Sequence, residues 1–492
     1  MSRITPIWKK KGNAMDPTKH RGISILSSLG KIGISIILNR ISTFYNNQLK
    51  RTQFGFRSGM GCNDGIYMMK QLQEIASKSQ RKLYVCFVDL TAAFDHVNRT
   101  LLFKTIRQRL ASNNQNTINI EILEKLYETT KAYLQNDNPE TDCFETSSGV
   151  RQGAQEGPPL YNLYSDFVTR VYDDKKQSAG ISGLGISYSI PSEATNREQR
   201  AEAPASGICD DEDCGYADDT AIVSWDVEEL HTCMTILYQT FTEYGLNLNF
   251  TKTESMIMNW NTTSDGTYPE SIISVNNYTI RNVTSFKYLG VWINHSSIHI
   301  CKEEVEHRVA SAHNAFAENR KLLTNQSIEL ATRIEFLKAL VRSRLTYGCH
   351  AWRPSFSEMY KFETTYRYFL RLMIWNGLTR VNPPSSEDDL EDSLDDDTID
   401  WRYRINNQEL YRLTKTETIE DFHRKQQNNW VSHVIRRRND NICKILTFDT
   451  TRRTKRGRKT PSILERAIEY SGTSRTEFIR NSFNKRNLQE SQ

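Results

Sequence analysis

Two adjacent carboxylates, Asp218 and Asp219, most constrain how this chain can fold. They lie in the string CGYADDTAIVSW, residues 214–225, with short apolar residues on both sides. This pattern predicts a strand, a tight turn and a returning strand, with both acids at the tip. Adjacent like charges repel each other, so the pair indicates a bound divalent cation. A simple surface turn is the alternative, because Asp is a common turn residue.

A third acid ends a second predicted strand. Leu83–Val88 is a short run of apolar, β-branched and aromatic residues, which is typical of a buried strand, and Asp89 follows it directly. If this strand lies beside the acidic hairpin, three acids meet, and such a set can hold two magnesium ions roughly 4 Å apart for phosphoryl transfer. A helix N-cap is the alternative for Asp89, since the sequence from Thr91 looks helical. Asp95 lies beyond the strand end and is expected only to support the turn.

Further motifs follow one another in a fixed order. They are FVDLTAAFD, GVRQG, YADD, GLNLNFTKTE and FKYLGVWI, preceded by KHRGISILSSLGKI (residues 19–32) and QFGFRSGMGCNDGI (residues 53–66). In this order they resemble motifs A to E and the finger motifs of reverse transcriptases from non-LTR (LINE-type) retrotransposons. The resemblance implies an α+β fold, the right-hand polymerase. Its parts would be fingers, a palm made of an antiparallel sheet backed by helices, a helical thumb and a basic C-terminal region.

The resemblance also implies the chemistry. Asp89, Asp218 and Asp219 would be catalytic and would bind metal together with the backbone carbonyl of Leu90. The implied cofactors are two Mg²⁺ ions, with Mn²⁺ as a substitute. The implied reaction is RNA-templated DNA synthesis, in which a primer 3′-hydroxyl attacks a dNTP and pyrophosphate leaves. The partners would be an RNA template, a DNA primer or target DNA, and dNTP, during retrotransposition in the nucleus or cytoplasm of a eukaryotic cell.

A substrate-binding set is implied in the same way. Phe94 would lie under the incoming sugar, where a ring excludes a 2′-hydroxyl, and core packing is the alternative. Gln152 would touch the incoming nucleotide, and Lys252 would approach the leaving phosphate as a general acid. Arginine suits phosphate through its planar fork and lysine as a point charge, although a solvated basic face is the alternative. The whole set is Lys19, Arg21, Arg57, Phe94, Arg151, Gln152, Gly153 and Lys252.

Motif B departs from the family pattern. That motif commonly reads RQGxPLSP, whereas residues 151–158 read RQGAQEGP. Gly157 replaces the usual Ser, and an acidic Glu156 is expected beside the substrate path. One alternative is therefore an inactive retrotransposon remnant that only binds nucleic acid. A group II intron-type maturase or an RNA-dependent RNA polymerase is another, because palms share the acids, although Phe94 argues against ribonucleotides.

Composition suggests the domain boundaries. Glu387–Asp400 holds nine acids and no bases, which is typical of a disordered linker, and residues 401–492 carry 21 Lys and Arg against 10 Asp and Glu. Because the sequence begins within the finger motifs, we expect a partial reading frame without the endonuclease domain that many such elements encode. The predicted parts are fingers 1–80, palm 81–294 with a polar insertion at about 173–213, thumb 295–380, acidic linker 381–400 and basic region 401–492.

Two apolar stripes at helical spacing support the palm and thumb predictions. Leu230, Met234, Leu237 and Phe241 share one face of a helix predicted over Val227–Gly245. The second stripe, in the predicted thumb, is Leu330, Ile334, Leu337, Val341 and Leu345.

The tail carries a weaker resemblance to strings near the C-terminus of some LINE-type polymerases. The matching strings are WVSHVIRR, residues 430–437, and KRGRKT, residues 455–460. Arg452–Lys459 has six bases in eight positions, which suits a nucleic-acid contact or a nuclear localisation signal, with a disordered basic tail as the equal alternative.

The nine cysteines are scattered and form no Cys-x-x-Cys pair, so we expect reduced thiols in an intracellular protein. No apolar run is long enough to span a membrane, and no membrane partner is expected. The sequence leaves the oligomeric state open.

Overall fold

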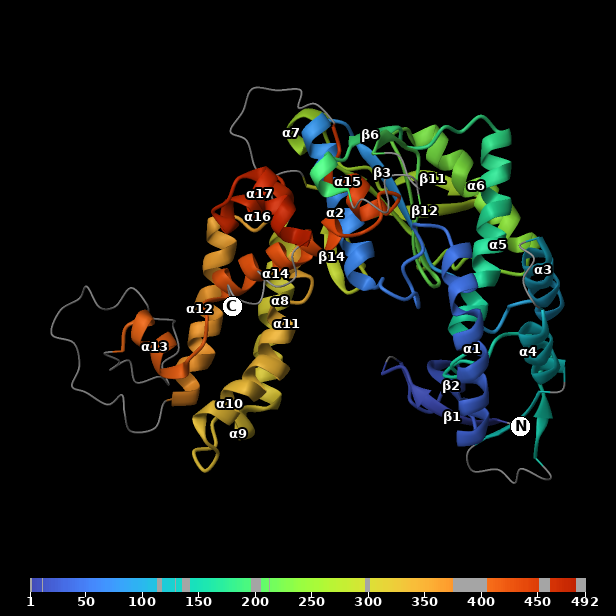
Figure 1. Ribbon diagram of the computed structural model, residues 1–492, viewed down its shortest axis with the longest axis horizontal. Helices are drawn as coiled ribbons and strands as arrows, with labels where there is room; N and C mark the ends of the chain where they lie inside the picture. Colours follow the sequence, from blue (N-terminus) through green and yellow to red (C-terminus); the bar gives the residue numbers. More distant parts are fainter. Residues whose placement is uncertain are drawn as a thin grey trace. The chain divides into compact units, whose positions relative to one another are not determined.

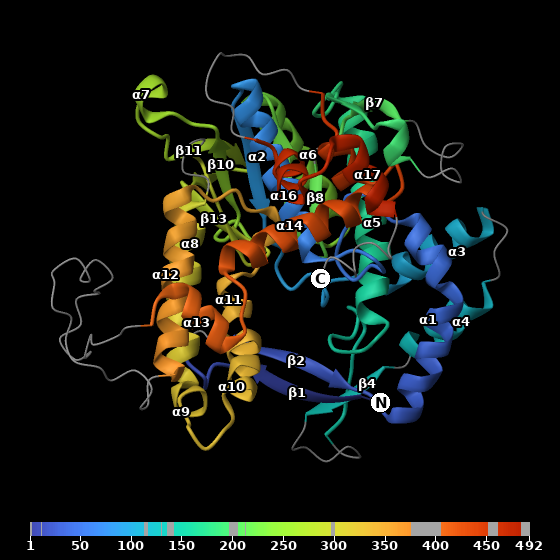
Figure 2. The same cartoon turned by 60° about the vertical axis from the view of Figure 1, so that its left-hand side comes forward.

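The computed structural model describes residues 2–10, 12–112, 117–128, 130–134, 142–195, 205–211, 213–296, 301–374, 405–450 and 461–483. The chain divides into two compact units. Unit 1 comprises residues 1–289 and 437–456, and unit 2 comprises residues 290–436 and 457–492. Figures 1 and 2 show the elements of both units. The predicted acidic linker and the basic cluster at 452–459 lie outside the described residues.

A six-stranded sheet forms the centre of unit 1, in the order β11-β12-β10-β3-β9-β8. β3 (Leu83–Val88) lies between β9 (Asp219–Ser224) and β10 (Glu254–Met258) and runs antiparallel to both. The other strands are β8 (Asp213–Tyr216), β11 (Ser271–Val275) and β12 (Tyr278–Asn282). The predicted antiparallel palm sheet is confirmed, except that β10 and β12 run parallel.

β3 is buried on both faces, which explains why apolar residues run through it without alternation. Cys86 and Val88 belong to a core cluster that includes residues of α5 (Gly157–Ser178) and α6 (Val227–Glu243). Phe87 points to the opposite face, where its ring stacks on Phe286 with centroids 4.0 Å apart. The helix predicted over residues 227–245 is confirmed as α6. Its four stripe residues, Leu230, Met234, Leu237 and Phe241, are all buried.

A second, four-stranded sheet in unit 1 has the order β2-β1-β4-β5. Its strands are β1 (Ser2–Trp8), β2 (His20–Ile25), β4 (Lys131–Leu134) and β5 (Phe144–Glu145). The first helices of unit 1 along the chain are α1 (Ser28–Gln48), α2 (Cys62–Ser79), α3 (Arg99–Ser112) and α4 (Ile118–Glu128).

The helix expected from Thr91 does not start there. Residues 91–98 form turns, and α3 begins at Arg99. The backbone of Ala92 has a φ of +47°, which a right-handed helix does not allow. The N-cap alternative for Asp89 is therefore wrong.

A return segment, residues 437–450, brings the C-terminal part of the chain back into unit 1. Its helix α15 (Ile442–Thr447) packs on α2. The segment also bonds through its backbone to β6 (Ile186–Ser189), which pairs with β7 (Ser206–Cys209). Part of the predicted polar insertion is thus regular structure covered by the return segment.

Polar groups fix the return segment in place. Lys444 is fully buried and donates to the backbone oxygens of Ala194 and Arg437, at 2.5 and 2.8 Å. Burial lowers its pKa to about 8. Arg437 in turn forms an ion pair with Asp64 at the start of α2. Charged side chains so enclosed must be partnered, and each of these is.

The described part of unit 2 is helical apart from its first strand, β14 (Val291–Asn294). It contains α8 (Lys302–Glu318), α9 (Arg320–Leu323), α10 (Leu330–Leu337), a π-helical turn (Lys338–Arg342), α11 (Ser343–Leu345), α12 (Phe356–Ile374), α13 (Asn407–Thr414), α14 (Ile419–Ile435), α16 (Ile463–Ser471) and α17 (Arg475–Phe483). The predicted thumb stripe packs in one core cluster, with four members buried and Leu330 partly buried. The chain leaves unit 1 between β13 (Ser285–Tyr288) and β14. A further short helix, α7 (Thr262–Asp265), belongs to unit 1.

No helix in the described ranges is long and apolar enough to cross a membrane.

Candidate active site

The three predicted acids lie at one end of a strand pair. Asp218 occupies the turn between β8 and β9, and Asp219 begins β9. Val88, the last residue of β3, pairs with Thr220 of β9. The strands are antiparallel, so Asp89, which follows Val88, and Asp219, which precedes Thr220, lie at the same end of the pair. The turn is tight, with Ala217 at a φ of +57°. The sequence analysis predicted that the three acids meet if the strand before Asp89 lies beside the acidic hairpin, and β3 does pair with β9.

The carboxylates influence one another electrostatically. Partial loss of water, followed by the charges of Asp218 and Asp89, raises the pKa of Asp219 to about 6, although its side chain is exposed. Loss of water and the charge of Asp89 also raise the pKa of Asp218. A part of both shifts therefore comes from neighbouring negative charge, which a cation bound there would relieve.

Asp89 has a protein cation beside it. The ammonium of Lys252 lies 3.0 Å from its carboxylate, and the Lys252 side chain is 65% exposed. The loop that carries this lysine is fixed to the strand end, because the Asn249 N–H donates to the Asp89 carbonyl at 2.8 Å. Leu90, next in the chain, is a buried core residue whose backbone forms a bridge with Leu248. With Asp89 turned to Lys252, no three metal-ligating side chains of the described residues converge on one point.

The three acids nevertheless fit a divalent ion by their chemistry. Their donor atoms are all carboxylate oxygens, which Mg²⁺ prefers, and the raised pKa values of Asp218 and Asp219 report uncompensated charge. Lys252, which pairs with Asp89, is on an exposed and flexible side chain that can leave.

Phe94 lies on the chain between the third acid and α3. Its ring stacks on Tyr161 of α5, with centroids 4.5 Å apart and planes 12° apart. Phe94 is only partly buried, whereas Tyr161 is fully buried. One face of the Phe94 ring is thus supported by the core, so the ring is held in a fixed position.

The loop of motif B depends on two glycines. Gly149 and Gly153 have φ values of +78° and +87°, which favour glycine. A Cβ on Gly153 would also lie 2.6 Å from the Ile23 side chain. Between them, the Gln152 amide donates to Asp95 at 3.3 and 3.4 Å, and the Gln152 carbonyl accepts from the Ser24 N–H at 2.8 Å.

The predicted basic residues separate into two groups. Arg21, on β2, is exposed and close enough to Asp218 to lower its pKa, and Lys19 is half-exposed, 4.0 Å from Asp16. Arg57 instead donates to backbone oxygens of residues 46 and 50, at 2.8 and 2.7 Å. Arg151 donates to the Leu126 carbonyl at 2.7 Å, with 14% of its side chain exposed. Arg21, Lys19 and Lys252 are therefore accessible, while Arg57 and Arg151 hold the protein scaffold.

Glu156 does not lie on an open substrate path. Its side chain is buried beneath the start of α5, where it accepts from the Tyr127 hydroxyl at 3.3 Å and lies 3.7 Å from Arg151. The expectation from motif B was wrong because the partners that enclose Glu156 come from α4 and from the preceding loop.

Gly157 has a packing reason of its own. A Cβ at this position would lie 2.3 Å from the backbone oxygen of Arg151, a distance that no side chain tolerates. The Ser of the family pattern does not fit this backbone. The unusual motif B is therefore consistent with an intact loop.

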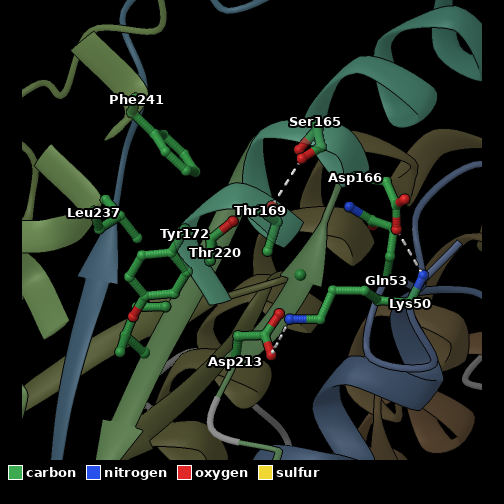
Figure 3. Close-up of a pocket in the computed structure, with 12 residues that line it drawn as sticks. Lys50, Gln53, Ser165, Asp166, Thr169, Tyr172, Asp213, Thr220, Leu237 and Phe241 are labelled. Carbon is green, nitrogen blue, oxygen red and sulfur yellow. Dashed lines mark hydrogen bonds and ion pairs between the residues drawn. The ribbon is translucent and has the colours of Figure 1, made fainter. Parts of the chain in front are cut away.

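Sequence reasoning missed a buried charge network behind the strand pair. Lys50 lies 2.7 Å from Asp173 and 3.1 Å from Asp213 of β8, and Figure 3 shows its ammonium directed at Asp213. Lys50 and Asp213 border a cavity of about 20 Å³ between the sheet and helices α5 and α6, which is enough for about one water and far too small for a nucleotide. The network thus belongs to the scaffold, and its members, far apart in sequence, left no local signal.

Comparisons with known proteins agree with this arrangement. The family model described as "Reverse transcriptase (RNA-dependent DNA polymerase)" matches residues 8–293. The "RNA-directed DNA polymerase from mobile element jockey" of Drosophila melanogaster is 22% identical over 371 residues, 71% of this chain and 35% of that protein. The "Retrovirus-related Pol polyprotein from type-2 retrotransposable element R2DM" of the same species is 26% identical over 161 residues, 33% and 15% of the two chains.

Among solved structures, apo telomerase from Candida tropicalis is 13% identical, with a TM-score of 0.41, covering 61% of this chain and 54% of that one. The chain spans about a third or less of the length of the curated relatives it matches. The family model nevertheless covers more than half of this chain, and the motifs occur in the order of the LINE-type members. The chain belongs to the reverse transcriptase family.

Proposed function

We propose that this chain catalyses RNA-templated DNA synthesis during retrotransposition, by nucleotidyl transfer from a dNTP to a primer 3′-hydroxyl. The observation that carries the proposal is the set of three carboxylates at one end of β3 and β9, two of them with raised pKa values. When bound, two Mg²⁺ ions supply a lowered pKa of the attacking hydroxyl and neutralise the leaving pyrophosphate. Asp89, Asp218 and Asp219 would hold them.

The chain's own residues position the substrates. Arg21 and Lys252 are accessible cations near the acids and suit the triphosphate. Lys252 would exchange its contact with Asp89 for the leaving phosphate, to which it can donate a proton. Arg57 and Arg151 would act indirectly, by holding the finger and motif B loops.

The partners would be an RNA template, a DNA primer or target DNA, and dNTP, in the nucleus or cytoplasm. The direct test is extension of oligo(dT) on poly(rA) with dTTP and Mg²⁺. Labelled product of template length supports the proposal. Folded protein that binds the template in a salt-dependent way yet extends nothing would instead identify an inactive remnant. The burial of Glu156 and the tight packing at Gly157 offer a structural reason for the two motif B departures that favoured that alternative.

The Phe94 ring provides a test of substrate choice. Phe94→Ala removes a ring that Tyr161 holds in place, so a 2′-hydroxyl no longer meets a steric block. We expect the preference for dNTP over NTP, measured as the ratio of kcat/KM values, to fall by roughly 10- to 100-fold. Phe94→Tyr keeps the ring and serves as the control. Equal preference in wild type and Phe94→Ala would assign the ring to core packing alone.

The raised pKa of Asp219 predicts a pH dependence of metal binding. Below about pH 6 this carboxyl holds a proton that a metal must displace, so the Mg²⁺ concentration for half-maximal activity should rise about 4-fold between pH 7.5 and 5.5. In the metal-free protein, lower pH has the opposite effect, because it increases the free energy of unfolding instead of weakening an interaction. Because the folded state binds this proton more tightly than the unfolded chain, the free energy of unfolding falls as pH rises from about 4 to about 6.

Thermal denaturation without metal at pH 4.5 to 7.5 measures the second effect without any activity. Asp219→Asn should lose the Asp219 part of this pH dependence of stability. A wild-type and an Asn variant with identical pH profiles would contradict the assignment of the titration to Asp219.

A further inference from the structure

The loop after the first acid and the motif B loop are joined by backbone contacts. The Val150 N–H donates to the Phe94 carbonyl at 2.8 Å, and the Ser148 hydroxyl donates to the Asp95 carbonyl at 3.2 Å. A Cβ on Gly149 would lie 2.8 Å from the Cα and carbonyl oxygen of Asp95, so glycine allows the two loops to touch. The position of Asp95 relative to motif B is therefore fixed by the main chain.

The Asp95 side chain contacts Gln152 of motif B. The Gln152 Nε2 donates to the two carboxylate oxygens of Asp95 at 3.3 and 3.4 Å. An ionised carboxylate accepts hydrogen bonds and donates none, so it selects the amide orientation with Nε2 toward Asp95. The Gln152 Oε1 then remains as the acceptor. The main chain of Gln152 is held separately, because its carbonyl accepts a hydrogen bond from the Ser24 N–H.

We propose that Asp95 is a positioning residue that sets the orientation of the Gln152 carboxamide and thereby the affinity for the incoming nucleotide. The proposal rests on the proposed function, in which Gln152 touches that nucleotide. Asp95 was expected from the sequence only to support a turn, yet its carboxylate faces the amide rather than the turn. A side chain fixed in advance loses less conformational entropy when a ligand binds.

The test compares Asp95→Ala, Asp95→Asn, Gln152→Ala and the double variant Asp95→Ala/Gln152→Ala in steady-state primer extension. We expect KM for dTTP to rise about tenfold in Asp95→Ala with kcat nearly unchanged, the size of one hydrogen bond to a charged group. Asp95→Asn can accept from Nε2 or donate to Oε1, so it selects neither amide orientation, and its KM should lie between those of wild type and Asp95→Ala. The double variant should match Gln152→Ala, because Asp95 acts through the amide.

Two measurements separate this proposal from the proposed function. Template–primer affinity and melting temperature should match wild type in Asp95→Ala, since a merely structural role would change them. Equilibrium affinity for dTTP, by calorimetry on the template–primer complex, gives a readout without turnover. An inactive wild type would overturn the proposed function alone. Additive effects of the two substitutions, or a dTTP affinity unchanged by Asp95→Ala, would overturn the positioning role.

Discussion

Primer extension by Asp218→Asn is expected to fall by on the order of 10³-fold, with the protein still folded. The substitution keeps the shape of the side chain but removes the charge with which the proposed site would hold a divalent ion at the tip of the β8–β9 turn. Electrostatic stabilisation of developing charge usually contributes more to such catalysis than any other single effect. Because loss of water and Asp89 raise the pKa of Asp218, removing this charge should not destabilise the metal-free protein.

The matched control is Asp174→Asn, the same chemical change on an exposed position of α5 in the same unit. It should extend primers at the wild-type rate. Asp218→Asn must also bind template–primer like wild type and melt at the same or a higher temperature. Extension within about threefold of wild type in Asp218→Asn would remove this residue from the metal site.

The strands that carry the candidate site could be predicted because their pattern is local. Leu83–Val88 was predicted as a buried strand, and β3 has those bounds. An acidic two-residue turn between apolar runs can likewise be recognised without knowing which distant residues it contacts, and the turn at Asp218 was predicted correctly. What the sequence could not supply was the neighbour of each strand. The register of β3 with β9 decides whether three acids meet, and register is set by packing across the sheet.

The misjudged positions are those whose partners are distant in sequence. Glu156 was expected to face the substrate because a lone acid beside a glycine gives no sign of burial. Tyr127, its hydrogen-bond partner, lies on another helix. The return segment was missed for the same reason. Lys444 stands in a stretch that reads as part of a basic tail, and only the fold shows it fully buried among backbone carbonyls.

The return segment leads to the prediction with the largest effect on stability. Arg437→Met should lower the free energy of unfolding by about 3–5 kcal/mol, because Asp64 would remain buried without its cation. Asp64 is 2% exposed and also accepts from the Gly61 N–H at the start of α2, so the loss should loosen that helix start as well. Denaturant unfolding followed by circular dichroism measures the change. The melting temperature should fall by roughly 10 °C.

The next residue offers a matched control for this prediction. Arg438 pairs with Asp440, and both side chains are about half exposed, so Arg438→Met should cost no more than about 1 kcal/mol. Asp64→Asn combined with Arg437→Met removes both charges and should recover part of the loss, because the cost lies in the unpaired carboxylate. Equal stability of the Arg437 and Arg438 variants would show that the return segment does not hold unit 1 together through this pair. A double variant as unstable as the sum of the single ones would trace the loss to packing of the side chains.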